Sequence, residues 1–539
     1  MNRLRRFLIA GALVLASCHP VSLNTARAPT WGSPHELRIG VVSDPYSLNP
    51  LFAVAQTSID GASLYTETLV GLNDHNELIP LVAERVPSRA NGDISSDGLS
   101  ITYHLRRDER FADGVPLTSR DVAFTYHVIM DPRNPVSEPQ PYHEIAALET
   151  PDSHTVRIRL RRPWAAAVSE LFAMSDFGYG ILPAHAFPAG TDIAHADWNN
   201  HPFGSGPFRV TAWRRGDEIV LEPNAYARRR PALRRLTIKI IPDRNSMFIA
   251  LRTHTIDLAD LTEEQVKQAR ALADVRVVNT PNNYTVYLEF QTQRAPTDDP
   301  LVRRAIGEAV DRDALLKNVF LGLYPPATTE IPPVLWAHDS ALQPTPFDPK
   351  SAAADLDRAG WRLINGGRYK DGRPLQVEFS FLGTNQQNRR LATEVQAQLR
   401  AVGIDTVLRG YPSTLYYAPA SAGGIQYGGH FNMAYGGWYG GTDPEQSESL
   451  TCDRRAPDGS NYSRFCNAEY DRLFAAQKVT FARESRRRDF VEMQRIVRAN
   501  AIYDFLAYPT TYTAINPGLR NFKPNMLFEF WNSEAWDVP

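Results

Sequence analysis

A run of glycine and aromatic residues at positions 435–441, Tyr-Gly-Gly-Trp-Tyr-Gly-Gly, constrains this chain more than any other short stretch. Glycine lets a second backbone come close, while indole and phenol rings present broad apolar faces with a polar tip. Such a mixture fills a core poorly and favours a surface that grips an extended ligand. The alternative is that Trp438 and Tyr439 are ordinary buried aromatic residues beside a glycine-rich turn.

The first eighteen residues, MNRLRRFLIAGALVLASC, predict that the protein is exported. Arginines precede an apolar stretch from Phe7 to Ala16 that is too short to cross a bilayer as a mature helix, which is typical of a secretory signal. The ending Leu-Ala-Ser-Cys resembles a bacterial lipobox, in which Cys18 becomes the acylated first residue. Several acyl chains would then hold the protein on a membrane. An ordinary signal peptide with an incidental cysteine is the alternative.

If Cys18 carries lipid, Cys452 and Cys466 are the two cysteines that remain, fourteen residues apart. An oxidising compartment and an even count predict one disulfide, which stabilises by about 3 kcal/mol in the chain-entropy model. A metal site would need further ligands nearby, and the sequence offers none there, so we expect no metal.

The length of 539 residues is too great for a single core and predicts two or three domains. A hydrophobic fraction of 43% and a charged fraction of 22% are ordinary for a soluble globular protein. The formal net charge is only −2, so nothing in the charge balance indicates a nucleic-acid partner.

A search for catalytic motifs finds little support for an enzyme. The chain has no HExxH, GxSxG or CxxC motif. His185, His195 and His201 share one segment, but their spacing matches no zinc pattern. Residues 204–207, Gly-Ser-Gly-Pro, lack the further glycine of a dinucleotide loop. We therefore expect a binding protein without a cofactor, and a secreted hydrolase is the unsupported alternative.

Helix starts are the clearest local signals. Asp299 and Pro300 are predicted to be the N-cap and first residue of a helix. Thr118 and Asp121 have the spacing of a capping box before an apolar helical stripe. Farther on, an apolar stripe predicts a helix whose basic start, Arg486–Arg488, is expected to be solvated.

Strand patterns are shorter. The stretch Asn282–Glu289 alternates Tyr284, Val286 and Leu288 with other residues, which predicts a strand with Tyr284 and Tyr287 on opposite faces. The stretch Tyr503–Thr513 is predicted to be a single strand that returns to an earlier part of the fold.

Several separate stretches together resemble one known family. They are Ser43–Asn73, Leu105–Tyr126 (LRRDERFADGVPLTSRDVAFTY), Ile181–Phe187 (ILPAHAF), and the order Trp438, Asp443-Pro444, GSNYS and FCNAEYD up to Asp471. In these stretches the chain resembles the family 5 extracytoplasmic solute-binding proteins, the oligopeptide- and dipeptide-binding proteins of ABC importers.

This resemblance implies an α/β chain with a type II periplasmic-binding-protein fold, in which two lobes carry an extra inserted α+β domain. The expected ranges are a signal peptide 1–17, a lipid-anchored linker 18–35, a first lobe in segments 36–77, 203–290 and 505–539, an inserted domain 78–202, and a second lobe 291–504.

The resemblance also implies the function. We expect a lipoprotein, anchored at the periplasmic face of a membrane, that captures peptides or a peptide-like solute between its lobes. It would act as a monomer and deliver the solute to the permease and ATPase subunits of an ABC importer. The same fold could instead bind a sugar, a metal chelate or haem, or serve as a sensor or chaperone.

Carried over position by position, the ligand-binding residues would be Val54, Ala55, Gln56, Tyr284, Tyr287, Tyr435, Gly437, Trp438, Tyr439, Gly440, Gly441 and Asp443. One departure matters. In peptide-binding members the third residue after the tryptophan is an Asp that pairs with the peptide's amino group, and here that residue is Gly441. Asp443 lies two positions farther and fits an Asp-Pro turn. Either the amine is held elsewhere or the cargo lacks one.

Overall fold

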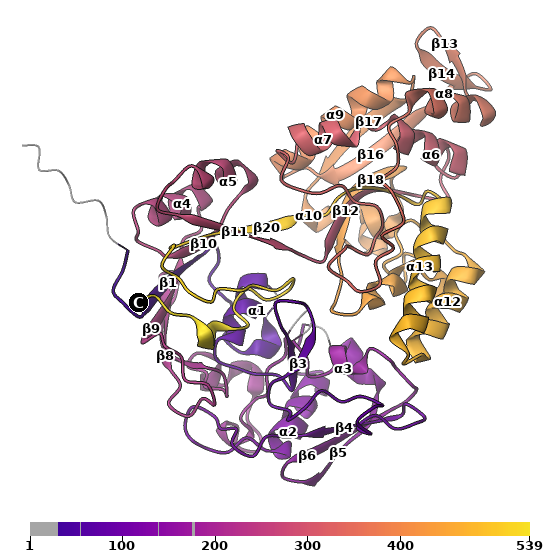
Figure 1. The fold of residues 1–539 in the computed structure, drawn as a ribbon. Coiled ribbons are helices and arrows are strands. Elements are labelled where there is room, and N and C mark those ends of the chain that lie inside the picture. The colour runs from indigo at the N-terminus through magenta and orange to yellow at the C-terminus, as the bar shows by residue number, and fades with distance from the viewer. Residues whose placement is uncertain (1–30, 54, 138, 175–177) are drawn as a thin grey trace, which may run out of the picture.

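The structure, a computed structural model, describes residues 31–53, 55–137, 139–174 and 178–539. The expected lipidation site Cys18 and the expected ligand residue Val54 lie outside these ranges. The described elements gather around one sheet of seven strands and one of five, which are joined by two short crossings of the chain (Figure 1). No helix in the described ranges is long and apolar enough to span a membrane.

The seven-stranded sheet is the centre of the first lobe. Central strand β1 (Glu36–Val41) runs parallel to both of its neighbours, and its Leu37 and Ile39 are fully buried in the core of this lobe. From edge to edge the strands are β11 (Arg276–Pro281), β20 (Thr510–Ile515), β10 (Leu258–Asp260), β1, β9 (Arg235–Ile240), β8 (Glu218–Pro223) and β7 (Phe208–Arg214).

The five-stranded sheet is the centre of the second lobe. Its strands follow the order β17 (Asp405–Tyr411), β16 (Gln376–Leu382), β18 (Met433–Tyr439), β12 (Tyr284–Phe290) and β19 (Tyr503–Ala507). Strand β12 lies between β18 and β19 and is antiparallel to both. The strand predicted at Asn282–Glu289 is therefore confirmed, and it forms an inner strand of this sheet.

Helices cover the second-lobe sheet and begin where the sequence predicts. The Asp299 carboxylate accepts a hydrogen bond from the Leu301 amide at 2.9 Å, at the start of α6 (Pro300–Ala309). Gly403, at φ +86°, turns the chain from α9 (Gln386–Ala401) into β17. The other helices here are α7 (Arg312–Asn318), α8 (Pro349–Arg358), α10 (Ser413–Tyr416), α11 (Ile425–Gly428), α12 (Ala468–Val479) and α13 (Arg483–Ala499), and the outer hairpin comprises β13 (Arg362–Ile364), β14 (Gly367–Lys370) and β15 (Arg373–Pro374).

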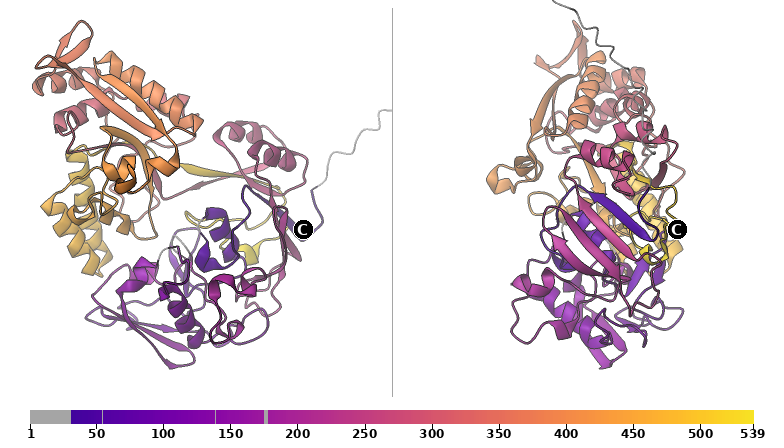
Figure 2. Two further views of the ribbon diagram at one scale, coloured as in Figure 1. Left: turned by 180° about the vertical axis from the view of Figure 1, so that it is seen from behind. Right: turned by 90° about the vertical axis from the view of Figure 1, so that its left-hand side faces the viewer.

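The segment expected to be the inserted domain contains a small sheet and a helix with its own core. The capping box is confirmed, because the Thr118 amide donates to the Asp121 carboxylate at 2.8 Å; the other Asp121 oxygen accepts from the Ala184 amide at 2.9 Å. In Figures 1 and 2 this part faces the second lobe. It comprises β4 (Ser100–His104), β6 (Thr155–Leu160), β5 (Ile145–Asp152), α2 (Ser119–Met130), α3 (Ala167–Glu170) and the 3-10 helix η2 (Gln140–Glu144). Beside the first-lobe sheet lie α1 (Gln56–Ser63), α4 (Arg244–Arg252) and α5 (Glu263–Arg270). The hairpin of β2 (Val70–Leu72) and β3 (Leu78–Pro80) packs against the core of the inserted segment.

The prediction of one strand over Tyr503–Thr513 is wrong. The stretch forms two strands in different sheets, β19 and β20, with the break at Tyr508–Pro509, because proline has no N–H to donate to a strand ladder. This break is one crossing between the lobes, and Asn282–Asn283 between β11 and β12 is the other. The expected boundaries 290/291 and 504/505 fall at the end of β12 and within β19.

Cys452 and Cys466 form the predicted disulfide. It closes a loop beside the second-lobe core, where the Cys452 amide also donates to Asp471 at 3.1 Å.

We predict that replacing both cysteines by alanine lowers the free energy of unfolding by about 3 kcal/mol, because the unfolded chain regains the freedom that the closed loop denies it. Urea denaturation measures the loss. Reductant should destabilise the wild type to the level of the double variant and leave that variant unchanged. A wild type indifferent to reductant would contradict the prediction.

Candidate functional site

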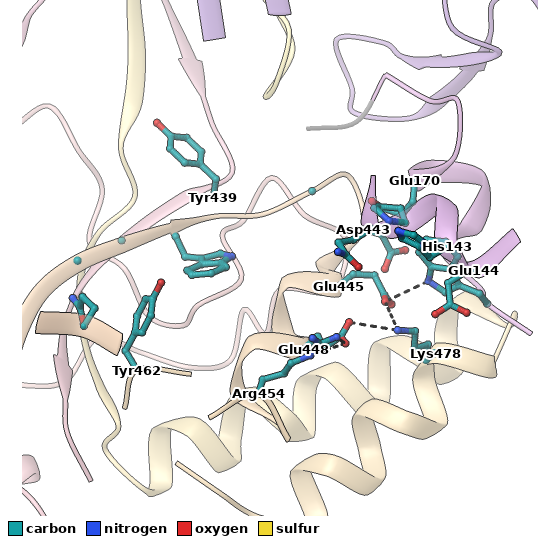
Figure 3. A pocket seen from close by; sticks show the side chains of 18 of the residues that line it. His143, Glu144, Glu170, Tyr439, Asp443, Glu445, Glu448, Arg454, Tyr462 and Lys478 are labelled. Carbon is teal, nitrogen blue, oxygen red and sulfur yellow. Dashed lines mark hydrogen bonds and ion pairs between the residues drawn. The ribbon is translucent and has the colours of Figure 1, made fainter. Parts of the chain in front are cut away.

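A cavity of about 660 Å³ lies between the inserted segment and the second lobe. Cavities of this size suit a drug-sized ligand. Figure 3 shows that tyrosine side chains stand at one end and charged side chains at the other. The inserted segment contributes Gln140, Pro141, His143, Glu144, Arg162, Trp164 and Glu170, and the second lobe contributes Tyr287, Glu289, Tyr417, Gln426, Gly436, Gly437, Trp438, Tyr439, Gly441, Asp443, Glu445, Glu448, Arg454, Tyr462 and Lys478.

The pairing of β12 with β18 decides which tyrosines face this cavity. Tyr287 lies opposite Gly436 and lines the main cavity together with Trp438. Tyr284 and Tyr435 point to the other face of the sheet and line a second cavity of about 410 Å³ at the crossings. The indole at position 438 is thus part of the wall between the lobes.

One edge of the glycine-rich strand has no partner strand. Strand β16 pairs with β18 only at Met433 and Ala434, whereas β12 pairs with β18 along its whole length. From Tyr435 onward, the edge of β18 away from β12 has no strand beside it in the described part of the chain. Free main-chain groups on such an edge can bind an extended peptide as an added strand.

Glycine is needed at positions 436 and 437 of this strand for different reasons. A Cβ at Gly436 would meet nothing closer than a Tyr287 ring carbon at 3.8 Å, so glycine here keeps the cavity open. A Cβ at Gly437 would collide with the ring of Tyr284, which stacks on Tyr439 at 4.1 Å between centroids. Gly437 is therefore required for ring packing on the opposite face.

Gly440 and Gly441 are hydrogen-bonded to Asn283, in the crossing between β11 and β12. The Asn283 side-chain amide donates to both of their carbonyl oxygens, at 3.1 Å for Gly441, and the Gly440 amide donates to the Asn283 carbonyl at 3.0 Å. Gly441 lines the main cavity, and Gly440 lies beside it.

The residues expected near the amino terminus lie elsewhere. Gln56 lines a smaller cavity of about 120 Å³ in the first lobe, and its amide donates to the Leu527 carbonyl at 2.8 Å. Ala55 precedes α1 and lines none of the cavities described here. Tyr439, which is 63% exposed, borders the main cavity, this smaller cavity and the cavity at the crossings.

Asp443 lines the main cavity but already has a cationic partner. Its carboxylate accepts two hydrogen bonds from the Arg486 guanidinium, at 2.7 and 2.5 Å, and both residues are buried. The expectation that Arg486 is solvated is wrong, because it lies on the same helix face as Phe490, which is fully buried.

The charged end also joins the two sides of the cavity. The Trp164 indole N–H of the inserted segment donates to Glu445 at 3.4 Å, and the Ala165 amide donates to the Lys478 carbonyl at 2.8 Å. Burial and the nearby Asp443 raise the pKa of Glu445 to about 7. Glu448 pairs with the Arg454 guanidinium and, at 3.4 Å, with the Lys478 ammonium.

The tyrosine end contains a carboxyl group that the sequence reasoning missed. Glu289 is 3% exposed, and burial raises its pKa to about 8. The nearby main chain of Ser463 opposes this rise of the pKa in part. Alternation along β12 was the available signal, since it places Glu289 on the same face as Tyr287.

The sequence matches one family of known proteins along most of its length. The model of the family described as bacterial extracellular solute-binding proteins, family 5 Middle, matches residues 77–455. The oligopeptide-binding protein AppA of Bacillus subtilis is 25% identical over 546 residues, covering 98% of this chain and 97% of its own. Heme-binding protein A of Haemophilus influenzae is 25% identical over 551 residues, covering 96% and 95%.

Among solved structures, NikA from Brucella suis in complex with Fe(III)-EDTA aligns with a TM-score of 0.81 at 25% identity, covering 94% of this chain and 100% of that one. The expected type II periplasmic-binding-protein fold is confirmed. The chain belongs to the bacterial extracellular solute-binding proteins, family 5.

Proposed function

We propose that this protein is the solute-capturing subunit of an ABC importer. It holds a peptide or peptide-like solute in the main cavity and presents it to a permease driven by an ATPase. Acylation of Cys18 would keep the protein at the membrane. It would act as a monomer and bind the solute without chemical conversion. The peptide-binding names among its relatives, such as AppA, support this cargo class.

The observation that carries the proposal is the cavity wall at β18. There a strand edge without a partner, the open surface at Gly436 and the flat indole of Trp438 occur together between two parts of the molecule. Main-chain hydrogen bonds hold any extended peptide, while rings tolerate varied side chains. A ligand that touches both walls binds the closed arrangement more tightly than an open one, which is the difference that a permease can detect.

A non-peptide cargo is the second candidate. A relative of similar coverage is named for haem, and NikA was solved with an iron chelate. Gly441 supports this alternative, because it leaves the cavity without an acidic side chain at the place where peptide-binding members have one. Native mass spectrometry of the protein purified without refolding tests both candidates, since the mass of a retained solute identifies its class. A retained sugar or metal chelate would contradict the peptide proposal.

We predict that Trp438→Ala weakens binding of the retained solute about 30-fold or more, as truncation of a central aromatic anchor in an interface typically costs 2 kcal/mol or more. Trp361→Ala, at the outer hairpin of the second lobe, is the matched control and should bind as the wild type does. Calorimetric titration of the stripped proteins measures both affinities. Equal affinity of the Trp438 variant and the control would contradict the assignment of this cavity.

A further inference from the structure

We propose that the tyrosine end of the main cavity is a subsite for a positively charged group of the cargo, an ammonium or guanidinium, with Glu289 as its counter-ion. This inference rests on the proposed function, which it makes more specific. It selects one of the two alternatives that Gly441 leaves open, namely that the cationic group is held elsewhere in the cavity.

The first step is to compare the carboxylates that line the cavity. Asp443 is paired with Arg486, Glu448 with Arg454, and Glu144 with Arg162. Glu445 lies between Lys478 and Arg486. Glu170 belongs to the inserted segment and lies at the charged end beside Asp443 (Figure 3). By contrast, no Lys, Arg or His within the described ranges forms an ion pair with Glu289, which shares the tyrosine end of the cavity with Tyr287, Tyr417 and Tyr462.

The second step is the surroundings of Glu289. Aromatic faces attract cations, and a carboxylate among them adds full charge in a place from which water is largely excluded. Tyr287, Tyr417 and Tyr462 line the cavity with Glu289, and Trp438 lies on the same wall. Contacts outside the cavity fix these rings: Tyr287 stacks on Tyr503 at 4.2 Å between centroids, and Tyr417 meets Tyr416 edge-on at 4.9 Å.

The third step is the space in front of Glu289. Its partner across the strand pair is Ala434, and the next residue on that face of β18 is Gly436. Two small residues therefore stand beside the buried carboxyl, where larger side chains would fill the space that a ligand needs. A buried carboxyl without a cation costs stability, so the arrangement gains most when a ligand supplies the charge.

Binding of a cation at this subsite also releases the proton of Glu289. Without a cation Glu289 is protonated at pH 7, because burial raises its pKa to about 8. A bound cation favours the carboxylate, so the proton passes to the buffer. Within the described ranges, the titratable groups that interact with Glu289 are tyrosines, whose pKa values are raised too and which stay neutral: Tyr287, Tyr416, Tyr417, Tyr462 and Tyr503.

The experiment uses the purified full chain and two matched pairs of probes: the tripeptide Ala-Phe-Ala with its N-acetylated form, and phenethylamine with phenethyl alcohol. Calorimetry should show that the wild type prefers the cationic member of at least one pair by about tenfold or more, and that Glu289→Gln reduces this preference to about twofold or less. Wild-type binding at pH 7 should release about one proton, measured in buffers of different ionisation enthalpy, and the variant should release none.

The control is Glu84→Gln, which removes an exposed carboxylate that does not line the cavity and should keep the full preference. If Glu289→Gln does not fold, Tyr417→Leu replaces it, since Tyr417 is 47% exposed and tolerates change; it should lower the preference in part. A wild type without preference for the cation in both pairs overturns the inference. A preference confined to the amine pair, with no peptide bound, contradicts the peptide cargo and supports the cationic subsite.

Discussion

Arg486→Met is expected to lower the free energy of unfolding by about 3–5 kcal/mol, because it leaves the Asp443 carboxylate buried without its cation. The guanidinium also donates to the Gln477 side chain at 2.8 Å and lies over the Trp336 ring at 5.2 Å from its centroid. The arginine thus joins the start of α13 to α12 and to the cavity wall, and all of these contacts are lost together.

Urea denaturation of the variant measures the effect. Arg488→Met is the matched control, because Arg488 is exposed on the same helix and should change stability by about 0.5 kcal/mol or less. The double variant Asp443→Leu with Arg486→Met should recover part of the loss, since it removes both buried charges. Equal stability of the Arg486 and Arg488 variants would show that the pair contributes nothing.

Asp60→Asn is expected to be more stable than the wild type in mildly alkaline solution and to lose that advantage in acid. Burial raises the pKa of Asp60 to about 8. Between the ordinary pKa and about 8 the folded protein holds a proton that the unfolded chain has released, so wild-type stability falls as pH rises through this window. Asparagine does not titrate, and the variant escapes this loss.

The expected gain at pH 8.5, relative to the difference at pH 5, is roughly 2–4 kcal/mol, since each unit of pKa difference corresponds to about 1.4 kcal/mol. Burial also raises the pKa of Asp260 and of Glu529, whose carboxyl oxygens both lie within hydrogen-bond distance of the Thr513 hydroxyl, at 3.0 and 2.6 Å. Removing Asp60 relieves Glu529 of a like charge.

Calorimetric melting at pH 5 and pH 8.5 provides the test. Glu84→Gln should melt as the wild type does at both values, because it removes a carboxylate that is exposed. A difference between Asp60→Asn and the wild type that stays constant with pH would contradict the burial of a protonated carboxyl at this position.

Local signals predicted much of the fold because their physics is local. Asp299 and Pro300 specify a helix start through one side-chain hydrogen bond and one fixed dihedral angle, and the structure contains both. The division of Tyr503–Thr513 could not be read from alternation, which continues across the break. Pro509 was the available signal, and its meaning depends on two sheets that meet only in the folded chain.

Arg486, which was wrongly predicted to be solvated, shows a different limit of prediction from sequence. Three consecutive arginines suggest solvent, yet a helix turns each by about a hundred degrees, so just one of them shares the face of Phe490. Helical periodicity could have singled it out, but its partner Asp443 belongs to a distant segment. Glu289 is a similar case, since alternation gave its face, and only the pairing of β12 with β18, which places Ala434 opposite Glu289 and Gly436 opposite Tyr287, shows that this face is open.

The link between Asn283 and the carbonyls of Gly440 and Gly441 has a mechanical consequence. Asn283 lies in one of the two crossings between the lobes. Its hydrogen bonds therefore connect this crossing directly to the main chain that follows β18. A change of the main-chain angles at Asn283 would therefore move the main chain of Gly440 and Gly441, which border the proposed binding cavity. Under the proposed function, a solute bound against these glycines would thus be coupled through Asn283 to the angle between the two lobes.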